Sequence, residues 1–201
     1  MTLWTGEFGN EYTVRNRDSS AFDRAEIWRT LIPCERWNVN SILEVGANVG
    51  KNLEAIETIS HCDLLACEPN DMARAELESK RITTKLTADC ADKLSFETGS
   101  ADLVFTCGVL IHIGPEKLLA SMREIHRVSR RYIICAEYFA PSEEMVPYRG
   151  QNDALWRRDY GSLYLDNFSD LHCISNFFAW KRMTAFDNIT FWVFEKGPRW
   201  N

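Results

Sequence analysis

The sequence predicts an α/β fold in which helices cover both faces of a mainly parallel β-sheet. Short runs rich in Ile, Val, Leu and Phe alternate with longer segments of helical period, which is the pattern of buried parallel strands joined by helices. After Pro141 the alternation stops, and two strand-like segments follow one another with no helical segment between them. We therefore predict seven strands, of which the last is antiparallel and closes the sheet in a hairpin.

Each predicted strand is a short apolar run bounded by polar or small residues. The seven runs are Ser41–Val45, Asp63–Cys67, Lys85–Thr87, Leu103–Cys107, Tyr132–Ala136, Ile174–Trp180 and Thr190–Phe194. Apolar residues at helical spacing predict helices near Ser20–Leu31, Lys51–Ile59, Asp71–Ser79 and Glu116–Val128. The polar and aromatic stretch from Pro141 to Phe168 carries no predicted helix or strand.

Composition excludes several classes of protein. Hydrophobic residues make up 45% of the chain and charged residues 26%, so neither disorder nor a coiled coil is expected. A net charge of −6 argues against a nucleic-acid partner. The chain shows no signal-peptide pattern and no apolar run of about eighteen residues, so we expect a cytoplasmic protein without a membrane partner. The seven cysteines form no CxxC pair, and we expect reduced, mostly buried thiols.

The stretch "LEVGANVGK" (residues 43–51) joins the first predicted strand to the next helix. Small residues from Gly46 to Gly50 let the backbone approach a ligand at the carboxyl edge of the sheet, where open α/β sheets bind ligands. A tight turn without a ligand is the alternative. The second strand is followed by Glu68, whose carboxylate can accept hydrogen bonds from ribose hydroxyls, and the third is followed by Asp89. Together these groups predict a nucleotide-type ligand.

Two cofactors compete for this edge of the sheet. A dinucleotide fingerprint needs G-x-G-x-x-G, but counting from Gly46 the chain has Asn48 and Lys51 where the second and third glycines belong. It has instead acid-x-Gly-x-x-x-Gly, led by Glu44. This pattern resembles motif I of the class I S-adenosylmethionine-dependent methyltransferases, and "LTADCADKLSFETGSADLVFTCGVLIHI" resembles the same family. The resemblance implies a Rossmann-like sheet, S-adenosyl-L-methionine as cofactor, its ammonium group near Glu44 and its adenine near the end of the third strand.

Other phrases resemble a narrower group. "WTGEFGNEYTVRN", "GVLIHI", "AEYFAP", "PYRGQNDALWRRDYG" and "FDNITFWVFEK" are similar to the small methylases associated with pseudaminic acid biosynthesis, and the similarity covers nearly the whole chain. That group tends to show a paired acid before its last strand, where this chain has Asp187-Asn188, and the aromatic order in "ITFWVFEK" also differs. The resemblance implies a small anionic acceptor, a sugar or nucleotide sugar of surface-glycan biosynthesis, methylated on oxygen in preference to nitrogen.

The acceptor side of the site is expected after the fourth and fifth strands. His112 stands just past the fourth strand, where it acts as a general base, orients the acceptor or only caps the turn. Arg149 lies between Pro147 and Gly150 and is the preferred anion anchor, because arginine binds carboxylate or phosphate in a bidentate way. For at least one of the paired arginines 157 and 158 we expect a solvated helix face instead.

The full expectation for the site has two groups of residues. The cofactor-binding group is Glu44, Gly46, Asn48, Gly50, Glu68, Pro69, Asp89, Cys90, Cys107 and Tyr12. The catalytic and acceptor-binding group is His112, Arg149, Tyr138 and Tyr148. No metal is expected. The N-terminal residues Trp4, Phe8, Tyr12 and Arg15 are expected to form a lid over the cofactor or simply to pack together.

We predict a single methyltransferase domain over residues 1–201. Its parts are an N-terminal lid and helix (1–35), a cofactor-binding core (40–138), an acceptor-site insertion (139–170) and a closing hairpin (171–201). Two alternatives remain: a nucleotide-dependent oxidoreductase on a Rossmann-like sheet, which the absent glycines disfavour, and a non-catalytic scaffold that binds the cofactor. The oligomeric state is left open.

Overall fold

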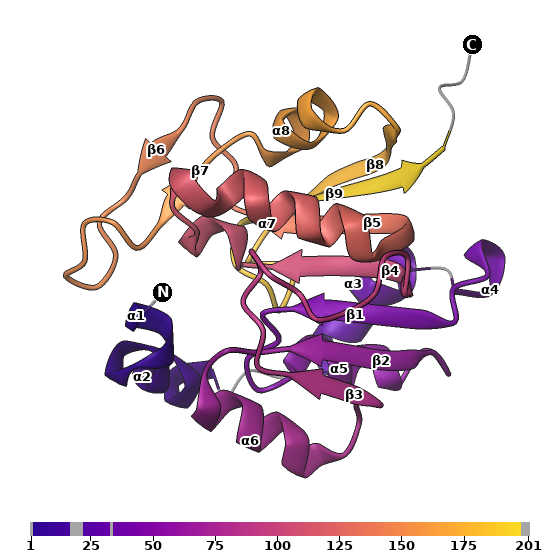
Figure 1. Ribbon diagram of the computed structural model, residues 1–201, viewed down its shortest axis with the longest axis horizontal. Coiled ribbons are helices and arrows are strands. Elements are labelled where there is room, and N and C mark those ends of the chain that lie inside the picture. Colours follow the sequence, from indigo (N-terminus) through magenta and orange to yellow (C-terminus); the bar gives the residue numbers. More distant parts are fainter. Residues whose placement is uncertain (1, 17–21, 33, 198–201) are drawn as a thin grey trace. The chain divides into compact units, whose positions relative to one another are not determined.

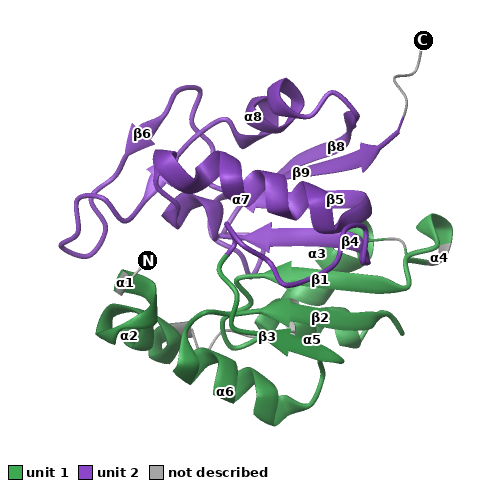
Figure 2. Ribbon diagram, viewed as in Figure 1, with its two compact units in different colours: residues 1–90 green, residues 91–201 purple. Residues whose placement is uncertain are grey.

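The computed structural model describes residues 2–16, 22–32 and 34–197. Its contacts divide the chain into two compact units, residues 1–90 and 91–201 (Figure 2). The strands follow the order β3-β2-β1-β4-β5-β9-β8 in a seven-stranded sheet, which confirms the predicted number. The single domain predicted from the sequence stays a prediction, and the two units are described in turn.

The first unit is a three-stranded parallel arrangement with helices around it (Figure 1). Its elements are α1 (Thr2–Thr5), α2 (Glu7–Asn16), α3 (Phe22–Leu31), α4 (Cys34–Trp37), β1 (Ser41–Val45), α5 (Lys51–Glu57), β2 (Asp63–Cys67), α6 (Asp71–Lys80) and β3 (Lys85–Thr87). The three strands have the predicted bounds. Of the predicted helix Ser20–Leu31, the first two residues lie outside the described part of the chain.

Register brings the carboxyl ends of these strands to one level. Val45 of β1 pairs with Cys67 of β2, and Cys67 pairs with Thr87 of β3. In β1, Ile42, Leu43 and Val45 are at most 1% exposed, so burial on both faces fixes the strand where the apolar run predicted it. The loops that follow the strands therefore start side by side at one edge.

Two contacts hold α6 against this edge. Asn70 caps the start of α6, where its Oδ1 accepts a hydrogen bond from the N–H of Ala73 at 2.9 Å. At the other end of the helix, Lys80 Nζ donates to the carbonyl of Val49 at 2.6 Å and pairs with Glu54 at 3.0 Å. Both ends of α6 are thus fixed by polar side chains.

The second unit carries the other four strands of this sheet and a separate pair of short strands, β6 and β7. Its elements are β4 (Ala101–Cys107), the 3₁₀ turn η1 (Leu110–His112), α7 (Pro115–Val128), β5 (Ser129–Glu137), β6 (Glu144–Met145), β7 (Trp156–Arg157), α8 (Tyr160–Asn167), β8 (Leu171–Ala179) and β9 (Ile189–Lys196). β4 and β5 are parallel, whereas β9 is antiparallel to both β5 and β8. This confirms the predicted antiparallel last strand and closing hairpin.

Helix α7 is the most strongly amphipathic segment of this unit. Leu118, Met122 and Ile125 are buried at helical spacing, and Pro115 occupies the first turn, where its missing N–H costs nothing. In Figure 1 the helix lies in front of β5 and runs alongside β4. At its end, Lys196 Nζ donates to the carbonyl of Ser129 at 2.6 Å and to that of His126.

The insertion after Pro141 is more regular than predicted. β6 and β7 pair as a short antiparallel hairpin, and α8 follows directly. Asp159 caps α8 by accepting from the N–H of Ser162 at 3.0 Å, while Tyr160 and Tyr164 are buried four residues apart on one face. The cap pattern Asp-x-x-Ser was a usable signal in the sequence. The strands β4, β5, β8 and β9 begin one to three residues before their predicted starts. β5 and β9 also end one and two residues later than predicted, whereas β8 ends one residue earlier.

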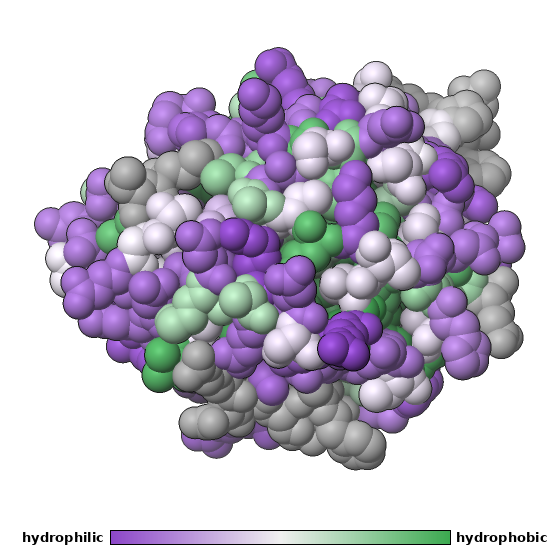
Figure 3. Space-filling model, turned by 60° about the horizontal axis from the view of Figure 1, so that its bottom comes forward, coloured by the Kyte–Doolittle hydropathy of each residue, from purple (hydrophilic) through white to green (hydrophobic). Residues whose placement is uncertain are grey.

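Hydrophilic residues cover most of the face shown in Figure 3, and smaller apolar areas lie among them. Within the described ranges, no helix is long and apolar enough to cross a bilayer. The large apolar side chains that are exposed include Ile174, Phe178, Trp180 and Met183, which lie in β8 and the turn that follows it.

We predict that Gly50→Ala lowers the free energy of unfolding by about 2–4 kcal/mol. The alanine would be strained in the left-handed backbone region, and its methyl group would be overpacked against α6. Gly50 has φ 79°, and an added Cβ would lie 2.4 Å from Leu77 Cδ1 of α6. Gly150→Ala is the matched control, because Gly150 has φ 82° with no atom within 4 Å of the added Cβ, so only the strain of roughly 1–2 kcal/mol remains. Urea denaturation measures both, and equal losses would refute the contact with Leu77.

Candidate functional site

The loop from Gly46 to Gly50, which we call the corner after β1, has residues in the left-handed backbone region. Gly46 has φ 74° and Asn48 has φ 48°, both in the left-handed region. The N–H groups of Gly46 and Ala47 donate to the carbonyl of Cys67 at 2.9 and 3.1 Å, which ties the corner to the end of β2. At Gly50, by contrast, the close neighbour is Leu77, so helix packing is sufficient to require this glycine.

Glu68 joins the corner to the start of α6. Its Oε2 accepts from the N–H of Asn48 at 2.7 Å, and its Oε1 accepts from the N–H of Asn70 at 2.8 Å. The side chain is 7% exposed; burial raises the pKa of Glu68, and the two N–H groups and Arg74 lower it. Each carboxylate oxygen keeps a second lone pair, so this geometry leaves acceptor capacity for hydroxyl groups.

Glu44 is buried at the end of β1 with one oxygen unused. Its Oε1 accepts from Asn52 Nδ2 at 2.7 Å, while Oε2 has no hydrogen-bond partner among the described residues. Asn52 Oδ1 in turn accepts from Arg24 Nη1 at 2.7 Å. Burial raises the pKa of Glu44 to about 8, and the hydrogen bond from Asn52 and the charge of Arg24 oppose the rise. Asn52 was not predicted as a site residue, because nothing in its sequence context marks it as the partner of Glu44.

A second unused oxygen lies at the same corner. Asn48 Oδ1 is buried, and within the described part of the chain it too has no hydrogen-bond partner. Buried acceptors are rarely left unsatisfied unless water or a ligand completes them. An acidic oxygen and an amide oxygen suit a cationic or hydrogen-bond-donating ligand, so these residues fit the ammonium end of S-adenosylmethionine.

The polar groups after β2 and β3 gather around Cys67. Burial raises the pKa of the Cys67 thiol, and the charges of Glu68, Asp89 and Cys90 raise it further. Asp89 Oδ2 also accepts from the hydroxyl of Thr87 at 2.8 Å. The cofactor-binding residues predicted after β2 and β3, which we call the rim, thus lie together: Glu68, Pro69, Asp89 and Cys90. Cys107 is the last residue of β4 in the second unit and is partly buried.

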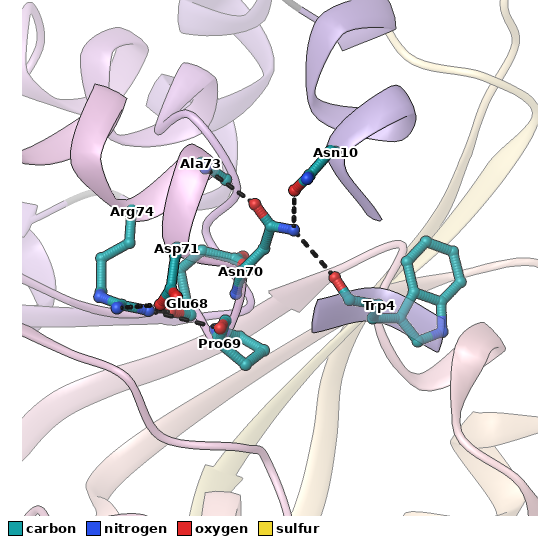
Figure 4. Close-up of polar contacts among 8 residues, drawn as sticks. All are labelled: Trp4, Asn10, Glu68, Pro69, Asn70, Asp71, Ala73 and Arg74. Atoms are coloured by element: carbon teal, nitrogen blue, oxygen red, sulfur yellow. Dashed lines mark hydrogen bonds and ion pairs between the residues drawn. The ribbon is translucent and has the colours of Figure 1, made fainter. Parts of the chain in front are cut away.

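The N-terminal helices are anchored beside this rim by Asn70 (Figure 4). Asn70 Nδ2 donates to the carbonyl of Trp4 at 3.0 Å and to Asn10 Oδ1 at 2.9 Å. The ring of Trp4 packs edge-on against Phe8 and Tyr12, with centroids 5.2 and 5.4 Å apart. The expected packing of these aromatic residues is present, and Tyr12 belongs to it; a lid over the cofactor stays a prediction.

In the second unit, His112 is held by a backbone carbonyl. Its Nδ1 lies 2.6 Å from the oxygen of Ala154, and its ring centroid lies 5.5 Å from that of Tyr148. Because a carbonyl oxygen only accepts, Nδ1 carries the hydrogen in the neutral ring and Nε2 carries the lone pair. Burial lowers the pKa of His112 to about 4, and the bond to Ala154 offsets part of the change. The imidazole is therefore neutral at physiological pH.

Of the other acceptor-side candidates, Arg149 is exposed, whereas Tyr138 is partly buried, as is His112. Tyr138 donates its hydroxyl hydrogen to Asp187 Oδ2 at 3.0 Å. Arg149 lies on an exposed turn at φ 49°, with its guanidinium 5.8 Å from the ring centroid of Tyr148. Tyr148 is partly buried.

The arginine pair departs from expectation. Both residues lie at β7 and just after it, so the predicted helix face is wrong; Arg157 is exposed, whereas Arg158 is only 2% exposed. Arg158 Nε pairs with Glu143 at 2.6 Å, and its Nη1 donates to the carbonyl of Ile113 at 3.0 Å. Adjacent identical residues give no sequence signal for which of them is buried. Within the described ranges, no group of three or more His, Cys, Asp or Glu side chains is placed to hold a metal ion.

Comparison with protein families identifies the region that contains this corner. Residues 43–134, a little under half of the chain, match the family model described as "Methyltransferase domain". The match supports methyltransferase activity, with S-adenosylmethionine as the cofactor. A search of curated proteins found no match.

Solved structures share the fold over nearly the whole chain. Magnesium protoporphyrin IX methyltransferase from Synechocystis PCC 6803 is 13% identical with a TM-score of 0.71, and the alignment covers 97% of each chain. 1,6-Didemethyltoxoflavin-N1-methyltransferase from Burkholderia thailandensis is 11% identical with a TM-score of 0.73, covering 98% of this chain and 88% of that one. A possible histamine N-methyltransferase from Thermotoga maritima is 14% identical with a TM-score of 0.65, covering 98% and 100%. These likenesses confirm the predicted Rossmann-like methyltransferase fold.

We predict that the stability that Glu44 confers declines as pH rises. The pKa of Glu44 is raised from 4.5 to about 8 in the folded state, so the folded state binds the proton more tightly than the unfolded chain. The free energy of unfolding of the wild type, relative to that of Glu44→Gln, should fall by on the order of 3 kcal/mol between pH 5 and pH 8.5. Denaturant unfolding at both pH values measures it. The exposed Glu57→Gln variant should show no such trend, and a flat difference for Glu44→Gln would refute the prediction.

Proposed function

We propose that the protein is an S-adenosylmethionine-dependent methyltransferase that acts on a small anionic acceptor, a sugar or nucleotide sugar of pseudaminic acid type surface-glycan biosynthesis. The observation that carries the cofactor assignment is the pair of unsatisfied buried oxygens, Glu44 Oε2 and Asn48 Oδ1, within the region that matches the methyltransferase model. The acceptor assignment rests on the resemblance of the sequence phrases to the pseudaminic acid methylases. The cytoplasmic location belongs to the same proposal.

The first unit supplies the residues that would hold the cofactor. Glu44 Oε2 would pair with the ammonium group, and a cation there favours the ionised carboxylate against the effect of burial. Glu68 would accept from the ribose hydroxyls through its remaining lone pairs, and Asp89 and Cys90 would lie against adenine. The bound cofactor supplies a methyl group on a sulfonium, and transfer to a nucleophile in line with that bond depends mainly on positioning.

The second unit supplies the residues proposed to act on the acceptor. His112 would accept the proton of the attacking hydroxyl at Nε2, because Nδ1–H is already given to the carbonyl of Ala154. Tyr148 and Arg149, whose side chains adjoin, would bind the sugar face and the anionic group, and Tyr138 would complete the acceptor site.

We predict that Glu68→Gln weakens S-adenosylhomocysteine binding by about 1.5–3 kcal/mol, the range for hydrogen bonds to a charged group. Gln keeps the side-chain length and an acceptor oxygen for one of the two backbone N–H groups, with its amide nitrogen facing the other, whereas Glu68→Ala removes the acceptors of both Asn48 and Asn70 and lowers stability further. Calorimetric titration measures the dissociation constant, with the exposed Glu78→Gln as control.

The same titration, run with S-adenosylmethionine, NAD and NADP, distinguishes the alternatives. Binding of NAD or NADP alone would favour the oxidoreductase and overturn the proposal. If the protein binds S-adenosylmethionine but transfers no methyl group to any of a panel of anionic sugars and nucleotide sugars, the proposed acceptor class is wrong.

We predict that His112→Ala lowers the methyl-transfer turnover with a hydroxyl acceptor by about 10²–10⁴-fold. The dissociation constant for S-adenosylhomocysteine should not change. Since burial lowers the pKa of His112 to about 4, the wild-type rate should lose no activity to imidazole protonation until the pH approaches that value. Transfer of a labelled methyl group from pH 4.5 to pH 9 measures the profile, with the exposed His61→Ala as control. Wild-type turnover in His112→Ala would rule out the base role.

A further inference from the structure

The turn that carries His112 cannot fix its own geometry. η1 is a single 3₁₀ turn, in which His112 N–H donates to the carbonyl of Val109 at 2.9 Å and Ile113 N–H to that of Leu110 at 3.1 Å. Such short turns have poor hydrogen-bond geometry and leave polar groups at both ends. The neighbours of these end groups therefore decide where the imidazole lies.

Glu137 satisfies the amino end of the turn. Its Oε1 accepts from the N–H groups of Val109 at 3.2 Å and Leu110 at 3.1 Å, and its Oε2 accepts from that of Ile111 at 3.2 Å. Glu137 is the last residue of β5 and is fully buried. Burial raises the pKa of Glu137 to about 7, and the hydrogen bonds from the N–H groups of the turn, which carry partial positive charge, oppose the rise and favour the carboxylate.

Arg158 satisfies the carboxyl end of the turn. Its Nη1 donates to the carbonyl of Ile113 at 3.0 Å and lies 3.4 Å from that of Leu110. The guanidinium is also held by Glu143 at 2.6 Å and by the hydroxyl of Tyr160 at 3.2 Å. Removing a buried cation with several partners leaves those partners unpaired, so the contact is a strong constraint on the turn.

The same arginine belongs to the segment that orients the imidazole. Ala154, whose carbonyl accepts from Nδ1 of His112 at 2.6 Å, precedes Arg158 by four residues. Ala154 is 1% exposed, and the side chain of Trp156 between the two is 9% exposed, so this short segment is packed against the interior of its unit. One segment thus positions both the backbone of η1, through Arg158, and the ring of His112, through Ala154.

We propose that Glu137 and Arg158 are positioning residues that clamp η1 from its two ends and hold His112 as the Nδ1–H tautomer, with Nε2 as the proton acceptor. Neither residue is assigned contact with substrate or cofactor. The inference rests on the proposed function only for the use of Nε2 as a base; the clamp and the tautomer are properties of the protein without ligands.

Side-chain ¹⁵N NMR of the full chain, without acceptor or cofactor, tests the clamp directly. The wild type should show a single neutral tautomer at His112, identified by the loss of its signals in His112→Gln, with a pKa near 4. In Arg158→Gln and Glu137→Gln the ring should become a tautomer mixture, and its pKa should rise toward the ordinary 6.5 as the turn opens to water. Arg157→Gln, the exposed neighbour, should behave as wild type.

If a Gln variant does not fold, a conservative variant at the same position allows the same measurement. Arg158→Lys keeps the charge with a single donor group, and Glu137→Asp keeps the carboxylate on a shorter stem, so each should give a His112 pKa between those of the wild type and the Gln variants. Wild-type tautomer and pKa in folded variants at both positions would overturn the clamp. Failure of the proposed function shows separately, as wild-type protein that does not bind S-adenosylhomocysteine in calorimetry.

Discussion

The loops that follow buried parallel strands have backbone N–H groups that need hydrogen-bond acceptors. In both units a buried glutamate supplies these acceptors. Glu68, just after β2, accepts from the loops that begin α5 and α6. Glu137, at the end of β5, accepts from three consecutive N–H groups of the turn after β4. In each case a carboxylate links its own strand end to a neighbouring loop, and the side chains expected to bind ligands project from these loops. The positions of these loops therefore depend on buried glutamates that stand at the ends of neighbouring strands.

Much of the fold could be predicted because burial and sequence pattern agree in its centre. β1, β2 and β3 have their predicted bounds, since their apolar runs are interrupted by polar residues at the points where the strands leave the core. Predictions were poorer where tertiary contacts decide the structure. α8 is short and mixes polar with aromatic residues, and its burial depends on Gly161 lying against Trp192, where an added Cβ would come within 2.4 Å of Nε1. No local pattern reports that contact.

The candidate site divides in the same way. Glu44 and Glu68 could be selected from the sequence, because they stand at the ends of two predicted strands and the parallel register brings those strand ends level. Their partners could not be selected in this way. Asn52, which donates a hydrogen bond to Glu44, comes from the next helix. Arg158 is buried and Arg157 is exposed only because side chains alternate direction along a short hairpin. The lowered pKa of His112 likewise follows from burial and from one carbonyl, that of Ala154, which lies 42 residues further along the chain.

The anchoring of α1 and α2 by Asn70 has a consequence for the order in which the chain assembles. Asn70 lies 60 residues after Asn10 and 66 after Trp4, the two residues its amide binds. At about 5–20 residues per second of synthesis, the N-terminal helices leave the ribosome roughly 3–12 s before their anchor exists. Isolated helices of four and ten residues are marginal in water. The polar anchor of α1 and α2 therefore becomes available only after the segment between β2 and α6 has been made.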